Sequence, residues 1–264
     1  MSLALKLSSM AVYFLLTLSA GVILIFANIS AISTDLVPSA LKYTSVDTST
    51  LAQQLTASNG ELDVSNLYAS DATAALGDSQ GVRQQYYFGQ YAYCGTSEDR
   101  RDGTCELARD ADAEFIGRLD PYTYIVDDTP QPLKDAVRGL LSTNQPTFAA
   151  SDYLRKYSAA GYWLVFLSAI FTGVALFSGV IPTRYTIAFG GVFALLAFLT
   201  VAVGASILTA LIVKMRHINS DALGVTVHYG VSLWLVWITT FILLVATPFY
   251  FVAWVLTYVG VKID

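Results

Sequence analysis

Four long stretches of the chain carry no charged side chain, and this feature limits the fold more than any other. They lie at about 10–27, 159–181, 185–213 and 229–258. A bilayer core about 30 Å thick is crossed by roughly 20 apolar helical residues. Hydrophobic residues make up 55% of the chain and charged residues only 13%, against about 25% charged in soluble domains. The chain is therefore predicted to be an α-helical membrane protein with four spanning helices.

The first stretch has a second interpretation, because Lys6 precedes it, as a basic residue does in a cleavable signal peptide. Small residues in 28–31 lie near a candidate cleavage point. The apolar part has about 18 residues, however, and such segments usually have roughly 7–15. We favour a membrane anchor that the mature chain retains.

The connections between the spans are very unequal in length. The loop between the first two spans is the only one long enough for a folded domain, and Pro248 is expected to kink the fourth span. The predicted division is an N-terminal tail (1–9), a first span (10–27), a loop domain (28–158), a second span (159–181), a turn (182–184), a third span (185–213), a short loop (214–228), a fourth span (229–258) and a C-terminal tail (259–264).

The long loop indicates the orientation better than the few Lys and Arg residues beside the spans, which do not decide it. From Asn28 to Tyr157 it contains eighteen acidic and ten basic residues, a net charge of −8. It also holds both cysteines, Cys94 and Cys105, and a cysteine pair in one loop suggests a disulfide formed outside the cytosol. We therefore place the loop outside the cell and both termini in the cytosol. The glycosylation pattern at Asn28 lies against the membrane, and we expect it to be unused.

The loop is predicted to be a small mixed α/β domain. Leu51, Leu55, Leu62 and Leu67 have helix-like spacing, whereas the aromatic run at 82–93 favours a strand.

Asp102-Gly103 is a typical tight-turn dipeptide. Cys94 and Cys105 would then join two strand ends, and closing such a loop stabilises the fold by about 3 kcal/mol in the chain-entropy model. Further helices are expected before Pro121, at 132–141, and from a cap at Ser151-Asp152 into the second span.

The run Phe88-Gly89-Gln90-Tyr91-Ala92-Tyr93 before Cys94, with Cys105 following, resembles the claudin-like group of four-span proteins. Tyr91 and Tyr93 stand where animal claudins would have a Gly-Leu-Trp element, and the loop is more than twice as long. These departures resemble the fungal Sur7/PalI family. Membership would imply a plasma-membrane protein of eisosome-associated furrows or cortical patches, linked to cell-wall integrity or pH response.

Acidic side chains are dense around the second cysteine and suggest a calcium site, but their spacing lacks the EF-hand pattern. We favour a solvated acidic face paired with Arg100, Arg101 and Arg109. The acidic residues are Asp99, Asp102, Glu106, Asp110, Asp112 and Glu114.

His217 and His228 share the short loop, but two histidines without further ligands make a poor metal site. Gly190, Gly191 and Gly204 are interpreted as close-packing positions between helices rather than substrate contacts. The spans contain no Asp, Glu, Lys, Arg or His, and ion or proton pathways usually need such groups. We expect no catalytic residue, metal or cofactor.

The favoured function is a non-enzymatic protein that organises a membrane domain. Its expected partners are membrane lipids and other membrane proteins or further copies of itself, as a homo-oligomer. The net charge of −5 does not suit nucleic-acid binding. Two alternatives stay open: an auxiliary subunit of a larger membrane enzyme or channel, and, less favoured, an enzyme of lipid or wall-polymer chemistry.

The predicted orientation is tested with protease on intact cells. Tags at Ser2 and after Asp264 should be protected, because both termini are expected in the cytosol, and a tag near 58–60 should be cut. An N-terminal tag that is accessible from outside, or missing from the mature chain, would support the signal-peptide interpretation instead.

Overall fold

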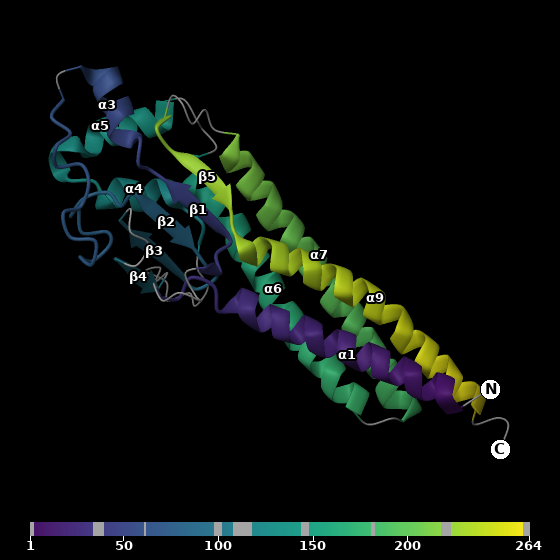
Figure 1. The fold of residues 1–264 in the computed structure, drawn as a ribbon. Helices are drawn as coiled ribbons and strands as arrows, with labels where there is room; N and C mark the ends of the chain where they lie inside the picture. The colour runs from purple at the N-terminus through teal and green to yellow at the C-terminus, as the bar shows by residue number, and fades with distance from the viewer. Residues whose placement is uncertain are drawn as a thin grey trace. The chain divides into compact units, whose positions relative to one another are not determined.

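The computed structural model describes residues 3–33, 40–60, 62–97, 102–107, 118–143, 148–180, 183–217 and 223–260. Contacts divide the chain into two compact units. The first contains Met1–Asn28, Trp163–Ser206 and Trp234–Asp264, and the second contains Ile29–Tyr162 and Ile207–Leu233. The elements are α1 (Leu3–Asn28), β1 (Thr44–Asp47), α3 (Leu51–Asn59), β2 (Gln85–Phe88), β3 (Ala92–Thr96), β4 (Gly103–Leu107), α4 (Pro121–Asp128), α5 (Gln131–Thr143), α6 (Ser151–Val180), α7 (Arg184–Arg216), β5 (Thr226–Tyr229) and α9 (Val231–Gly260) (Figure 1).

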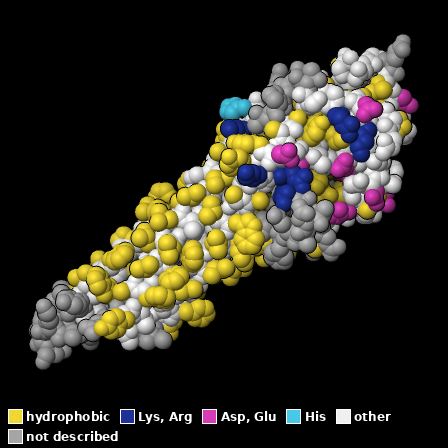
Figure 2. Space-filling model, turned by 180° about the vertical axis from the view of Figure 1, so that it is seen from behind, with side chains coloured by type: hydrophobic (Ala, Val, Ile, Leu, Met, Phe, Trp, Pro, Cys, Tyr) yellow, Lys and Arg dark blue, Asp and Glu magenta, His cyan; other side chains and the backbone are white. Residues whose placement is uncertain are grey.

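Among the described residues, four helices are long and apolar enough to cross a membrane, which confirms the predicted four-span fold. The candidate spans are Ser9–Asn28, Ser151–Val180, Tyr185–Arg216 and Val231–Thr257. The helix of the second span, α6, continues without a break from Ser151, where the sequence predicted a cap. The helix α9 continues through Pro248 to Gly260. Figure 2 shows apolar side chains predominating over the spanning helices, with the charged ones gathered over the second unit.

In the first unit, Tyr250 of α9 contacts the other three helices. Its ring stacks on Tyr13 of α1, with 4.2 Å between the ring centroids. Its hydroxyl donates to the carbonyl oxygen of Ala175 in α6 (3.0 Å) and shares a 3.2 Å hydrogen bond with Thr17. These bonds pair a buried hydroxyl that lipid could not satisfy. Tyr250 therefore adds both apolar contact and polar pairing to the interior of the bundle.

The second unit contains a five-stranded antiparallel sheet in the order β4-β3-β2-β1-β5. Four strands come from the long loop, as the mixed α/β prediction required. The fifth, β5, lies at the end of the short connection between the third and fourth spans and includes Tyr229, which was predicted to start the fourth span. It pairs with β1. Both loops therefore build one sheet.

The two faces of the sheet differ because side chains alternate along a strand. On one face, Tyr93 stacks on Tyr124 of α4 at 3.8 Å between centroids, and Phe88 lies 6.0 Å from the same ring. Figure 1 shows α4 and α5 beside the strands. The other face carries Tyr87 and Cys94, which are cross-strand partners. The aromatic run at 82–93 is thus divided between two strands, β2 and β3.

One predicted helix boundary in the loop is wrong. The helix expected from the leucine spacing ends at Asn59, so that Leu62 and Leu67 lie beyond it, and Gly60 has a positive φ of 32°. The helix expected before Pro121 falls mostly outside the described residues. Pro121 is the first residue of α4, and Asp120 accepts a hydrogen bond from Thr123 N. The helix expected at 132–141 is confirmed as α5.

A buried polar cluster holds the irregular segment between α3 and β2. The guanidinium of Arg83, 1% exposed, donates to the carbonyl oxygens of Ala74 (2.6 Å) and Gly81 (3.4 Å). The hydroxyl of Tyr86 accepts from Arg83 N (3.0 Å) and donates to Asp128 (2.6 Å). Side chains thus replace the regular backbone pairing that this segment lacks.

The carboxylate of Asp128 accepts one hydrogen bond on each oxygen, from Gly77 N and from the Tyr86 hydroxyl. Burial raises the pKa of Asp128, and the bonds from Tyr86 and Gly77 oppose this change. Since both oxygens accept, an amide at this position would turn its NH₂ group toward a donor.

We therefore expect Asp128→Asn to lower the free energy of unfolding by about 1–3 kcal/mol, the cost of an unpaired buried group. The matched control is Asp127→Asn, because Asp127 is 47% exposed in its ion pair with Lys134 and such pairs contribute about 0–1 kcal/mol. Thermal unfolding in detergent compares the two. Equal stability of both variants would contradict the role of the cluster.

Candidate functional site

The aromatic-glycine motif forms the turn between β2 and β3. Phe88 ends β2, Gly89 N donates to Ala92 O (2.9 Å), and Tyr93 lies in β3. A Cβ atom on Gly89 would overlap the carbonyl oxygen of Ser30, which follows α1. Only glycine therefore allows this close approach between the turn and the segment after the first span.

Gln90 fastens the same turn to the second span. It is fully buried, its backbone N–H bonds Ser30 Oγ (3.1 Å), and its Nε2 donates to Tyr162 O in α6 (3.3 Å) and to the Tyr91 hydroxyl (3.3 Å). The motif thus joins the sheet to the residues beside two spans. The residues that carry the family resemblance therefore help to assemble the loop domain.

Cys94 and Cys105 form a disulfide, as predicted. The two residues are direct partners in the β3–β4 register, so the bond crosses the middle of a hairpin rather than joining strand ends. Cys94 is buried with Tyr87 and Ala31. Ser97 N bonds Asp102 O at the turn (3.1 Å).

The acidic run falls mostly outside the described residues. Asp99, Arg100, Arg101, Arg109, Asp110, Asp112 and Glu114 all lie there. Glu106 is described and does not lie on a solvated face, because it is partly buried and accepts from Leu76 N (3.0 Å) and the Tyr93 hydroxyl (3.4 Å). Among the described residues, no group of three His, Cys, Asp or Glu side chains is placed to hold a metal.

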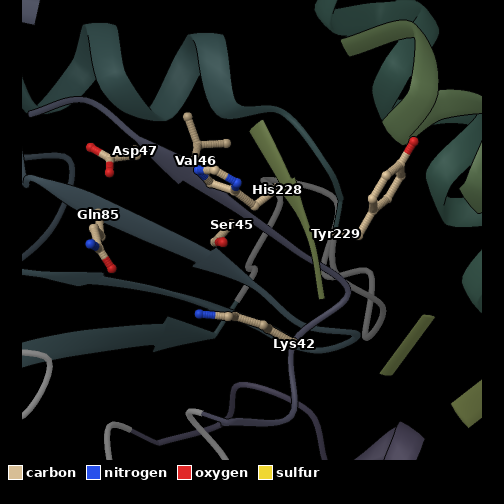
Figure 3. Close-up of a pocket in the computed structure, with 7 residues that line it drawn as sticks. All are labelled: Lys42, Ser45, Val46, Asp47, Gln85, His228 and Tyr229. Carbon is tan, nitrogen blue, oxygen red and sulfur yellow. The ribbon is translucent and has the colours of Figure 1, made fainter. Parts of the chain in front are cut away.

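A polar pocket of about 340 Å³ lies at β1, β2 and β5 and is the strongest candidate binding site. Figure 3 shows Lys42, Ser45, Gln85 and His228 around one space, with the Tyr229 ring turned away from them. Val46 and Asp47 complete the lining. The alternation of β1 places Ser45 and Asp47 on one face, opposite His228 and Thr226 of β5.

Contacts with neighbouring residues orient three side chains of the pocket. The Lys42 ammonium lies 3.7 Å from the centroid of the Tyr87 ring, within the range of a cation–π interaction. The Tyr87 hydroxyl donates to Gln85 Oε1 (2.7 Å). Asp47 accepts from Ser49 N (2.9 Å). The pocket therefore combines a cation, a carboxylate, an amide, a hydroxyl and an imidazole.

The predicted packing glycines lie on α7. A Cβ atom on Gly190 would lie 3.0 Å from Tyr250 Cε1, and one on Gly191 would lie 3.2 Å from Tyr250 Cβ. Gly204 is buried. Gly190 and Gly191 thus contact the interior of this chain's own bundle. His217 and His228 are both exposed, one after α7 and the other on β5.

Sequence reasoning missed the pocket because it missed β5. The residues Thr226–Tyr229 do carry a weak signal, since a β-branched and aromatic run is typical of a strand. No pattern in the sequence indicates that this strand pairs with β1, 179 or more residues away. The lining residues Lys42, Ser45, Asp47 and Gln85 are common surface types and gave no signal.

Comparison with known proteins gives one family. Residues 9–249 match a family model described as the SUR7/PalI family. The matched range begins in the first candidate span and ends in the fourth, and it includes the aromatic-glycine motif and both cysteines. No curated protein matches the chain.

We expect Cys94→Ser to lower surface abundance several-fold, because the loss of a native disulfide typically costs about 2–5 kcal/mol in a small domain. Ser97→Ala is the matched control at the end of the same hairpin, since its hydroxyl makes an exposed 3.5 Å contact with Asp102 O. Surface labelling measures both variants. Normal abundance of Cys94→Ser would show that the domain folds without the bond.

Proposed function

Because the chain belongs to the SUR7/PalI family, we propose that it is a non-enzymatic protein that organises a domain of the plasma membrane. It acts through lateral contacts with lipids and with other membrane proteins or further copies of itself. In this proposal the sheet domain lies outside the cell and both termini lie in the cytosol. The region of the plasma membrane that it organises is of the eisosome or cortical-patch type and supports cell-wall integrity.

The observation that carries this proposal is the distribution of side chains on the spanning helices. Large apolar side chains point outward, among them Phe177 (77% exposed) and Phe241 (69% exposed). Inside the bundle, the Tyr250 hydroxyl is paired with Ala175 and Thr17. Such an arrangement suits contact with lipid tails and neighbouring helices, since the Tyr250 hydroxyl is paired within the chain.

Five of the exposed apolar side chains of α9 recur at spacings of three, four and seven residues, which places these five on one helix face. They are Trp234, Ile238, Phe241, Val245 and Val252. This apolar row is the reason to keep a second candidate function, an auxiliary subunit of a larger membrane enzyme or channel. A helix of a partner chain would lie along the same row.

Native mass spectrometry of the protein extracted with its lipids distinguishes the two functions. The organising function predicts homo-oligomers, with bound lipid. A fixed stoichiometry with one larger catalytic chain would overturn it in favour of the auxiliary subunit. Single neutralisation of Asp102 should leave assembly unchanged, because an exposed charge contributes about 0–1 kcal/mol.

Assembly also requires an intact bundle, which two glycine variants test. We expect Gly190→Leu to lower the free energy of unfolding by about 1–3 kcal/mol, because a larger side chain would displace Tyr250. Gly173→Leu is the matched control on α6, since a Cβ atom there meets nothing within 4 Å.

Thermal unfolding of the solubilised chain and clustering in the membrane at matched expression give the two measurements. Gly190→Leu should reduce both. If Gly190→Leu assembles normally, the close-packing interpretation of this glycine is wrong. If Gly173→Leu loses clustering with normal stability, its side of α6 is a contact between copies.

A further inference from the structure

We propose that the pocket lined by Lys42, Ser45, Asp47, Gln85 and His228 binds the headgroup of a membrane lipid that carries both a phosphate and hydroxyl groups. A phosphoinositol headgroup has this chemistry. The inference rests on the proposed lateral contact with lipids and names the residues and the headgroup class. It is carried by the position of the pocket beside a span and by its mixture of polar groups.

Backbone hydrogen bonds place the pocket next to the start of the fourth span. Ser232 N donates to Lys42 O (3.0 Å), and Gly230 N donates to Tyr43 O (2.9 Å). The candidate span begins at Val231, three residues after His228. Three extended residues cover at most about 10 Å, and the headgroup layer adds about 5–7 Å on each side of the hydrocarbon core. A lipid headgroup therefore reaches the pocket.

Side chains at the ends of neighbouring helices also indicate that the pocket lies near the membrane surface. Arg216, the last residue of α7, lies over the Tyr229 ring at 4.7 Å from its centroid. Lys214 donates to the Tyr153 hydroxyl (3.0 Å). The ring centroids of Tyr153 and Tyr157 are 4.6 Å apart. Tyrosines and basic residues of this kind gather where a membrane meets water. The pocket is thus close to an interfacial belt.

The charged groups of the pocket suit a headgroup that has both a phosphate and hydroxyl groups. Lys42 supplies a positive charge at one side, which suits a phosphate. Asp47 would repel a bare phosphate but accepts hydrogen bonds from hydroxyl groups, as Gln85 does, while Ser45 can donate or accept. A headgroup with both kinds of group satisfies the whole set.

The volume agrees with one headgroup. About 340 Å³ lies at the low end of the range for small-molecule sites, roughly 300–1,000 Å³. The acyl chains would remain in the bilayer, since the lining side chains that Figure 3 shows are polar except for Val46 and Tyr229. The site therefore selects by headgroup and not by chain length.

The experiment uses the full chain in nanodiscs that contain phosphatidylinositol, phosphatidylserine or phosphatidylcholine, with lipid retention read by native mass spectrometry. Phosphatidylinositol should be retained best. Lys42→Gln should weaken its retention about tenfold, since a hydrogen bond to a charged group is lost. Lys134→Gln, the same change in a lysine paired with Asp127 away from the pocket, should have no effect.

Asp47→Asn provides a second variant that keeps an acceptor for Ser49 N. It should reduce the preference for phosphatidylinositol over phosphatidylserine, because the carboxylate no longer accepts from the ring hydroxyls. Equal thermal stability of both variants and the wild type shows that the domain is folded. Unchanged retention and preference in both folded variants would overturn the proposed site.

Free inositol 1-phosphate distinguishes a lipid from a soluble ligand. The proposal predicts weak binding of the free compound, since the lipid is concentrated beside the pocket. Tight binding of the free compound that phosphatidylinositol does not displace would overturn the lipid assignment. If lipid retention does not depend on the pocket residues but the protein still forms homo-oligomers, this inference alone is refuted. A fixed complex with a larger chain would refute the proposed function.

Discussion

The pairing of β1 with β5 is the contact on which the second unit depends. It joins Thr44–Asp47 to Thr226–Tyr229 in antiparallel register, so that a segment soon after the first span is held by one that directly precedes the fourth. Without this pairing, β1 would be an edge strand with unpaired backbone groups, and the short loop would have no fixed place. The pocket residues from β1 and β5 come together only through it.

The second constraint is the close approach of two segments of the chain at a glycine. Gly89 allows the β2–β3 turn to lie against Ser30, and Gly190 allows α7 to lie against Tyr250. In each unit the contact also pairs polar groups, because Gln90 N bonds Ser30 Oγ and the Tyr250 hydroxyl bonds Ala175 O. Each glycine thus permits a hydrogen-bonded contact that a larger residue would separate.

Features that depend on local chemistry could be predicted from the sequence. The four spans follow from the length of uncharged apolar runs, because a bilayer sets that length. The disulfide follows from two cysteines confined to one loop. Local patterns were insufficient where tertiary contacts determine the end of a helix or the pairing of a strand. The leucine spacing predicted a helix through Leu67, but this residue is buried beyond the end of α3. The pocket was missed because it needs a strand from the other loop.

The polar groups of the chain fall into two kinds according to what they contact. Tyr250 in the bundle and Arg83 with Asp128 in the sheet domain are buried, and their hydrogen bonds go to other parts of the same chain. Removing them would disturb folding. Ser45, Asp47 and His228 line an open pocket instead, where their polar atoms face a space that a ligand can enter. In the proposed lipid-binding role, the spanning helices would offer apolar surface, and the chemical selectivity would lie on the sheet beside the start of the fourth span.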